Sequence, residues 1–247
     1  MWDNLQLLAL MPPGWGGALL KGLMFTLIVA SGAYALGLAI GFAAAVGKIY
    51  GGTILKTALE AYTTLIRAVP ELVLILLLYF AGEAAINLAL IAVGLPAINI
   101  NPILAGILVL GFVQGAYTTE VIRAAMLAVP KGQVEAAYAY GMSRMKMLRR
   151  IMIPSMIPFA IPGLANLWLI VTKDTALLAV IGSVELATVT RQAAGSTRSY
   201  LLFYSAAAVI YLCVTLVSTW IFRQLERRYR PESGDAVKLN ELAIGRR

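Results

Sequence analysis

The sequence predicts an all-α membrane protein with five transmembrane helices and a basic loop on the cytoplasmic side. Of the 247 residues, 60% are hydrophobic and 13% are charged, whereas soluble domains carry about 25% charged residues. A helix needs about 20 mostly apolar residues to cross the hydrocarbon core of a bilayer. The stretches that meet this requirement cover residues 18–47, 58–80, 102–127, 156–182 and 200–222.

The first predicted span contains a face of small residues that recur at every fourth position: Ala33, Gly37, Gly41 and Ala45. Such a face lets another helix approach closely, and we expect it to pack within the subunit or against a partner. The predicted membrane domain covers residues 18–229, after an outer segment at 1–17. The polar composition of residues 230–247 predicts a flexible cytoplasmic tail.

Basic residues predict the orientation of the spans, because cytoplasmic loops carry an excess of Lys and Arg. Residues 1–15 and 81–101 contain no Lys or Arg, so we expect the N-terminus outside and the C-terminus in the cytoplasm. Arg191 and Arg198 lie on the predicted outer side against this rule. The residues predicted to lie inside are Lys48, Lys56, Arg123, Lys131, Arg144, Lys146, Arg149, Arg150, Arg223, Arg227, Arg228 and Arg230.

Several functional classes are excluded by what the sequence lacks. It contains no histidine, which removes the usual haem, copper and zinc ligands, and we predict no metal site. GFAAAVGKI at 41–49 faintly resembles a phosphate-binding loop, but its glycines lie one residue too far apart. Ile49 also stands where Ser or Thr would reach magnesium. The net charge of +8 follows from topology and anionic lipid, so no nucleic-acid partner is expected.

Ionisable residues lie inside or at the edge of the predicted spans. Each costs at least about 2.5 kcal/mol at the centre of a membrane helix unless it is paired or faces water. One interpretation makes them line a translocation path, and the other makes them internal ion pairs, for which Arg67 and Glu71, and Glu120 and Arg123, have suitable spacing. The six residues are Arg67, Glu71, Glu120, Arg123, Lys173 and Asp174.

The stretch EAAYAYGMSRMKMLRRIMIP, residues 135–154, predicts two short helices joined by a turn. The first helix is expected to end at Gly141 in the left-handed conformation, and Ser143 can cap the second. In the second helix, Met145, Leu148 and Met152 predict an apolar face. Pro154, Pro158 and Pro162 follow and predict either a hinge or a fixed bend.

The spacing of these residues resembles the EAA loop of the membrane subunits of bacterial ABC importers. An ordinary amphipathic surface helix is the alternative. The positions that match are Glu135, Ala136, Ala137, Gly141, Ile151 and Pro154. The stretches AYTTLIRAVPELVLILLLYF at 61–80 and GAYTTEVIRAAMLAVPKGQVEAA at 115–137 are similar to polar amino acid permeases. TLIRAVPELVL, KDTALL and QAAGST are similar to the Q subunits of importers for histidine, lysine, arginine and ornithine, or for opines.

This resemblance implies a type I ABC importer in the bacterial inner membrane. The expected partners are a second permease subunit of the M type, two cytoplasmic ATPase subunits and a periplasmic binding protein. ATP and magnesium would be bound by the ATPase subunits, so this chain would need no cofactor and would have no catalytic residue. The segment from Glu135 to Gly141 would be the coupling helix within a loop at 131–154.

Two other classes of function are weighed against this one. An ion-driven secondary transporter would use Glu71, Glu120 or Asp174 as its coupling carboxylate, but the sequence has no obvious inverted repeat. A scaffold that anchors cytoplasmic partners would not transport. Uptake that requires a separate ATPase distinguishes the importer from both.

Overall fold

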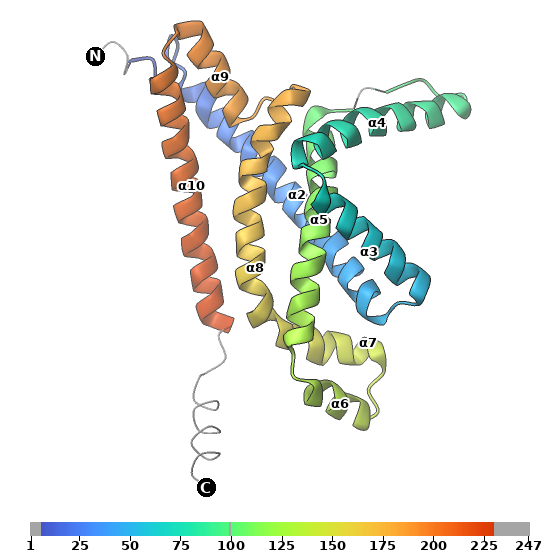
Figure 1. Cartoon of the computed structure of the whole chain (residues 1–247). Helices are drawn as coiled ribbons and strands as arrows, with labels where there is room; N and C mark the ends of the chain where they lie inside the picture. Colours follow the sequence, from blue (N-terminus) through green and yellow to red (C-terminus); the bar gives the residue numbers. More distant parts are fainter. Residues whose placement is uncertain (1–5, 99, 230–247) are drawn as a thin grey trace.

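A computed structural model of the chain describes residues 6–98 and 100–229, and in this part the structure is helical without β-strands (Figure 1). The elements are α2 (Gly16–Tyr50), α3 (Thr53–Ala68), α4 (Glu71–Ala92), α5 (Pro102–Ala128), α6 (Lys131–Ala139), α7 (Arg144–Met147), a π-helical segment (Leu148–Met152), α8 (Ile153–Asp174), a 3-10 segment (Thr175–Ile181), α9 (Leu186–Thr197) and α10 (Tyr200–Tyr229).

Within the described residues, five helical stretches are long and apolar enough to cross a membrane, as the sequence predicts. They are α2, α4, α5, the continuous stretch Arg144–Ile181, and α10. The first, third, fourth and fifth overlap the predicted spans. The stretch Arg144–Ile181 begins earlier than the predicted 156–182 because the basic helix α7 runs into α8 through the π-helical segment.

The second predicted span, 58–80, is wrong in its boundaries. The chain breaks between Ala68 and Glu71, because Pro70 has no N–H to donate and Val69 before it is extended, with φ −98° and ψ 139°. The apolar stretch is instead α4, which reaches Ala92, so residues 81–92 are helix rather than outer loop. Together α3 and α4 return the chain from the end of α2 to the level at which α5 begins (Figure 1).

The centre of the fold is the long contact between α2 and α5, which lie side by side in Figure 1. The predicted small-residue face of α2 makes this contact within the subunit. A Cβ added to Gly41 would lie 2.5 Å from Cβ of Thr118, and one added to Gly37 would lie 2.9 Å from Cγ of Gln114. Gln114 also donates a hydrogen bond of 3.1 Å to the carbonyl of Leu167 on α8. The absence of side chains at these glycines therefore sets the helix spacing.

The opposite end from α6 is closed by α9, which packs against α2 and α10. Glu185 precedes α9 and is 1% exposed. Its carboxylate accepts hydrogen bonds of 2.6 Å from the N–H groups of both Ala187 and Thr188, so it caps the helix. Burial raises the pKa of this carboxyl, and those hydrogen bonds act in the opposite direction.

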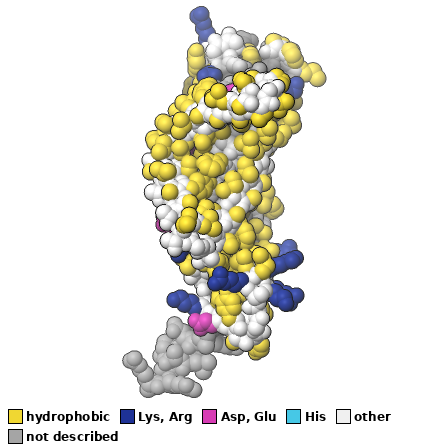
Figure 2. Space-filling model, turned by 90° about the vertical axis from the view of Figure 1, so that its right-hand side faces the viewer, with side chains coloured by type: hydrophobic (Ala, Val, Ile, Leu, Met, Phe, Trp, Pro, Cys, Tyr) yellow, Lys and Arg dark blue, Asp and Glu magenta, His cyan; other side chains and the backbone are white. Residues whose placement is uncertain are grey.

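The surface distribution of side chains agrees with a membrane protein. In Figure 2, hydrophobic side chains cover the middle of the visible face, and Lys and Arg side chains gather at the end that carries α6 and α7, with a few at the opposite end. Exposed large apolar residues on α10, such as Leu212, Leu216 and Trp220, are placed to contact lipid. Cys213 lies on the same helix and is also exposed.

Candidate functional site

The predicted turn of the cytoplasmic loop is present at the end of α6. Gly141 has a φ of +72°, which confirms the predicted left-handed conformation. The N–H of Met142 donates to the carbonyl of Ala137 at 3.0 Å, and the N–H of Gly141 donates to Tyr138 at 2.9 Å. This pair of hydrogen bonds is a Schellman motif, which ends a helix and satisfies its last carbonyls. The turn therefore fixes the direction in which the chain leaves α6.

The other residues of the EAA spacing lie on α6 and in the helix that follows the turn, and those on α6 divide between a buried and an exposed face. Ala137 is buried against the cluster that includes Met147, whereas Glu135 and Ala136 are exposed. Ala136, Ala137 and Ile151 line one small pocket between α6 and the helix that leads into α8. Pro154 is exposed in the first turn of α8. The structure thus brings Ala136, Ala137 and Ile151 together and leaves Glu135 on the outer face.

The second helix of the loop begins at its predicted cap. The Ser143 hydroxyl accepts from the N–H of Lys146 at 3.5 Å. The predicted apolar face is wrong at one position, because Met145 is 71% exposed and Met147 is fully buried instead. The cause is the π-helical turn at Leu148–Met152, whose extra residue shifts the register of the buried face. Leu148 and Met152 are buried as predicted.

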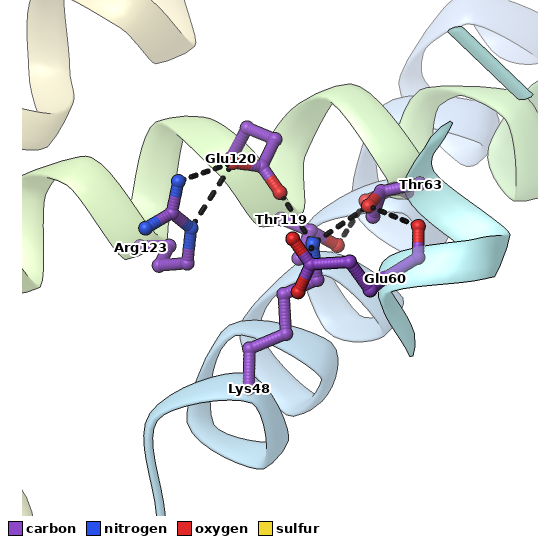
Figure 3. A network of polar contacts seen from close by, with 7 residues as sticks. Lys48, Glu60, Thr63, Thr119, Glu120 and Arg123 are labelled. Atoms are coloured by element: carbon purple, nitrogen blue, oxygen red, sulfur yellow. Dashed lines mark hydrogen bonds and ion pairs between the residues drawn. The ribbon is translucent and has the colours of Figure 1, made fainter. Parts of the chain in front are cut away.

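A network of polar contacts lies where α2, α3 and α5 approach one another (Figure 3). The Nζ atom of Lys48 donates to Oε1 of Glu120 and to Oγ1 of Thr63, both at 2.7 Å. The other carboxylate oxygen of Glu120 accepts two hydrogen bonds from Arg123, at 2.7 and 3.0 Å. Glu60 lies 3.9 Å from Lys48, and its side chain is largely exposed. Glu120 is therefore engaged on both oxygens within the subunit.

Lys48 has a role in this network that the sequence does not predict. The sequence places it only among the basic residues of the cytoplasmic side and gives it no partner, whereas its side chain is 4% exposed and paired. Lys48 lies in the last turn of an apolar span, where a lysine can also extend its ammonium group to the lipid headgroups. The local sequence does not distinguish such a lysine from a buried and paired one. Its partner Glu120 lies 72 positions away.

A second group of charged residues lies where α3 ends, α4 begins and α8 ends. The carboxyl groups of Glu71 and Asp174 are neighbours, and the hydroxyl of Tyr117 on α5 lies near Glu71. Arg67 lies near Tyr117, and Lys173 lies beside Asp174. Arg67 and Lys173 are exposed, whereas Glu71 and Asp174 are half-buried.

Among the ion pairs of the described residues, the pair between Arg67 and Glu71 that their spacing allows does not occur. The spacing of four residues brings side chains together only on a continuous helix. Here the chain is extended at Val69, between the two residues. Glu71 meets Asp174 instead, through a contact between distant parts of the sequence.

Comparison with known proteins places the chain in a family. The model of the binding-protein-dependent transport system inner membrane component matches residues 37–231. The histidine/lysine/arginine/ornithine transport system permease protein HisQ of Escherichia coli (strain K12) is 43% identical over 216 residues, which are 87% of this chain and 95% of HisQ. The octopine transport system permease protein OccQ of Rhizobium radiobacter is 39% identical over 227 residues, which are 92% of this chain and 96% of OccQ.

The fold has a counterpart among solved structures. A crystal structure of an amino acid ABC transporter with histidines contains a chain that superposes with a TM-score of 0.73 at 30% sequence identity. The match covers 87% of this chain and 95% of the other. Since family, relatives and fold agree over most of its length, the chain belongs to the binding-protein-dependent transport system inner membrane components, the multi-pass permease subunits of ABC importers.

Proposed function

We propose that this chain is the permease subunit of an importer for basic amino acids or opines. The observation that supports this substrate class is the meeting of Glu71 and Asp174. Two neighbouring ionised carboxylates repel each other, and a guanidinium or ammonium group placed between them removes the repulsion. The names of HisQ and OccQ, which refer to histidine, lysine, arginine, ornithine and octopine, agree with such a cargo.

The basic residues near the carboxyl pair suit the carboxylate group of an amino acid substrate. Arg67 and Lys173 flank the carboxyl pair and are exposed in the isolated subunit, so each can receive the carboxylate of a substrate. Tyr117 can hold Glu71 in place through its hydroxyl. In this proposal Glu120 and Arg123 belong to the network with Lys48 and do not contact the substrate.

Energy would enter through α6. We place α6 in a groove of a cytoplasmic ATPase subunit, with the exposed Glu135 and Ala136 at the contact and Gly141 fixing the direction of the helix. Closure of two ATPase subunits on ATP would then move α6 and tilt the attached spans between two packed arrangements. ATP and magnesium would be bound by these partners, and this chain would need no cofactor.

The complete complex would contain a second permease subunit, of the M type, and a periplasmic binding protein that delivers the substrate. We orient the chain with α7 and the π-helical segment in the cytoplasm of a bacterium and the start of α2 at the periplasm, which the basic residues on α7 and the π-helical segment support. An ion-coupled secondary transporter of small cations is the alternative. It assigns no role to the exposed face of α6.

Uptake by the reconstituted complex tests the substrate class. The chain is co-expressed with an ATPase subunit, a second permease subunit and a binding protein of the same importer, and the complex is placed in proteoliposomes. We expect uptake of arginine, lysine or octopine to exceed uptake of glutamate. Equal uptake of acidic and basic amino acids would contradict the role of the carboxyl pair, since Glu71 and Asp174 should repel an acidic side chain.

A further inference from the structure

Three helices meet at the buried ammonium group of Lys48. This residue lies in the last turn of α2, and it binds Thr63 on α3 and Glu120 on α5 at the same distance of 2.7 Å (Figure 3). The Thr63 side chain is 2% exposed. A buried ammonium group without a partner costs several kcal/mol, so the three helices are held together at this atom.

On one side, the network is joined to α6 by a short and packed connection. Glu120 lies about 12 Å before the end of α5 at Ala128, since each residue of a helix adds 1.5 Å. Only Val129 and Pro130 separate α5 from α6. Val129 is buried in the same cluster as Ala137 of α6. A displacement of α6 is therefore passed to the part of α5 that carries Glu120.

On the other side, α3 leads from the network to the charged group near the carboxyl pair. Thr63 lies one helical turn before Arg67 on α3. Glu71 follows after the break at Pro70. Thr63 thus ties α3 to Lys48 and through it to Glu120 of α5, beside the direct hydrogen bond of 2.6 Å from the hydroxyl of Tyr62 to the carbonyl of Phe112 on α5. The chain beyond Thr63 holds the residues that we assign to the substrate.

We infer that Lys48 and Thr63 are positioning residues that transmit the movement of α6 to the substrate path. The hydrogen bond between them, with the ion pair of Lys48 and Glu120, makes α3 follow α5 when the ATPase subunits move α6. Without this bond, α3 would keep its contact with α5 through Tyr62 and Phe112 but would follow α5 less closely, and the movement of Arg67 and Glu71 would lag behind that of α5. This inference rests on the proposed import function, and it predicts loss of coupling between ATP hydrolysis and transport.

The sharpest test removes one oxygen atom. Thr63→Val keeps the volume of the side chain and deletes the hydroxyl, whereas Lys48 keeps its ion pair with Glu120. Thr63→Ser keeps the hydroxyl and is the matched control. The complexes are reconstituted with loaded binding protein, and both arginine uptake and ATP hydrolysis are measured. The quantity compared is the number of arginine molecules imported for each ATP hydrolysed.

We expect Thr63→Val to hydrolyse ATP at close to the wild-type rate while importing about tenfold less arginine, the effect of losing one buried hydrogen bond to a charged group. Thr63→Ser should keep the wild-type ratio. A purely structural role would lower complex yield and reduce both rates in proportion, and this result would overturn the inference. An unchanged ratio in an assembled Thr63→Val complex would overturn it as well.

A second variant tests the coupling role of the network if the Thr63→Val complex does not assemble. Lys48→Met with Glu120→Gln removes both buried charges together, a change that proteins often tolerate. It should also lower the ratio of import to hydrolysis. Failure of both variants to assemble would show a structural requirement and contradict the inference. Wild-type complex that imports nothing on ATP would instead contradict the proposed function, so the two failures are distinguishable.

Discussion

Nζ of Lys48 lies 2.7 Å from Oε1 of Glu120, and this ion pair joins two spans whose residues are 72 positions apart. The second oxygen of Glu120 is held by Arg123 at 2.7 Å. Both oxygens of Glu120 are occupied inside the subunit. This favours the interpretation that Glu120 belongs to an ion-pair network over the interpretation that it lines the translocation path. Glu71 has no basic partner of this kind among the ion pairs of the described residues.

Glu120→Gln should therefore impair assembly. The change leaves the buried ammonium of Lys48 with only the largely exposed Glu60 at 3.9 Å, and removing one partner of a buried pair costs about 3–5 kcal/mol. We expect a lower yield of complex and a lower melting temperature in detergent. Normal yield together with selective loss of arginine uptake would place Glu120 in the substrate path instead.

Glu71→Gln should lower arginine uptake and leave the yield of complex unchanged, in contrast to Glu120→Gln. Its carboxyl group meets Asp174, so removing one of two like charges relieves repulsion and should leave the yield unchanged. Arginine uptake should fall about tenfold, as expected for the loss of one charged hydrogen bond to the substrate. Uptake assays on Glu71→Gln and Glu120→Gln complexes, normalised to yield, check both predictions, and normal uptake by Glu71→Gln would leave recognition to the binding protein.

Gly141→Val should uncouple transport while leaving the protein in the membrane. A β-branched residue resists the observed φ of +72°, and backbone strain of this kind costs about 1–3 kcal/mol. The loop should remain but point away from the ATPase. Gly132→Val in α6 is the control, because no atom lies within 4 Å of an added Cβ there. Equal transport by the two variants would argue against a role for the turn.

Gly41→Val should separate α2 from α5. An added Cβ would overlap Thr118 at 2.5 Å, and overpacking of a tight contact costs about 1–3 kcal/mol. We expect a lower melting temperature of the purified subunit. Gly82→Val on α4, where an added Cβ meets nothing within 4 Å, should change it less. Similar melting temperatures for the two variants would show that this contact does not depend on the glycine.

Local signals in the sequence were enough for some of these features. Gly141 and Ser143 act on neighbouring residues, so the turn and the cap could be predicted from spacing alone. Pro70 is a local signal as well, but the predicted span 58–80 runs through it, although it separates α3 from α4. The π-helical turn that buries Met147 depends on how α7 packs, and spacing in the sequence does not contain that information.

The contacts between distant residues could not be predicted. Lys48 pairs with Glu120 and Glu71 meets Asp174 only because α2, α4, α5 and α8 are brought together by the fold. The spacing of charges along one helix instead suggested Arg67 with Glu71, a pair that a break in the backbone prevents. The chemistry of each residue was visible in the sequence, whereas its partner was not.

The central claim is that this chain moves its substrate with energy supplied through α6 by a separate ATPase. The most direct measurement is arginine uptake into proteoliposomes that contain the complete complex, with ATP sealed inside and loaded binding protein outside. We predict uptake that is abolished by vanadate or by an ATPase subunit unable to hydrolyse ATP, and that is unchanged when ion gradients are dissipated. Uptake that persists without ATP and follows an imposed proton or sodium gradient would contradict the claim.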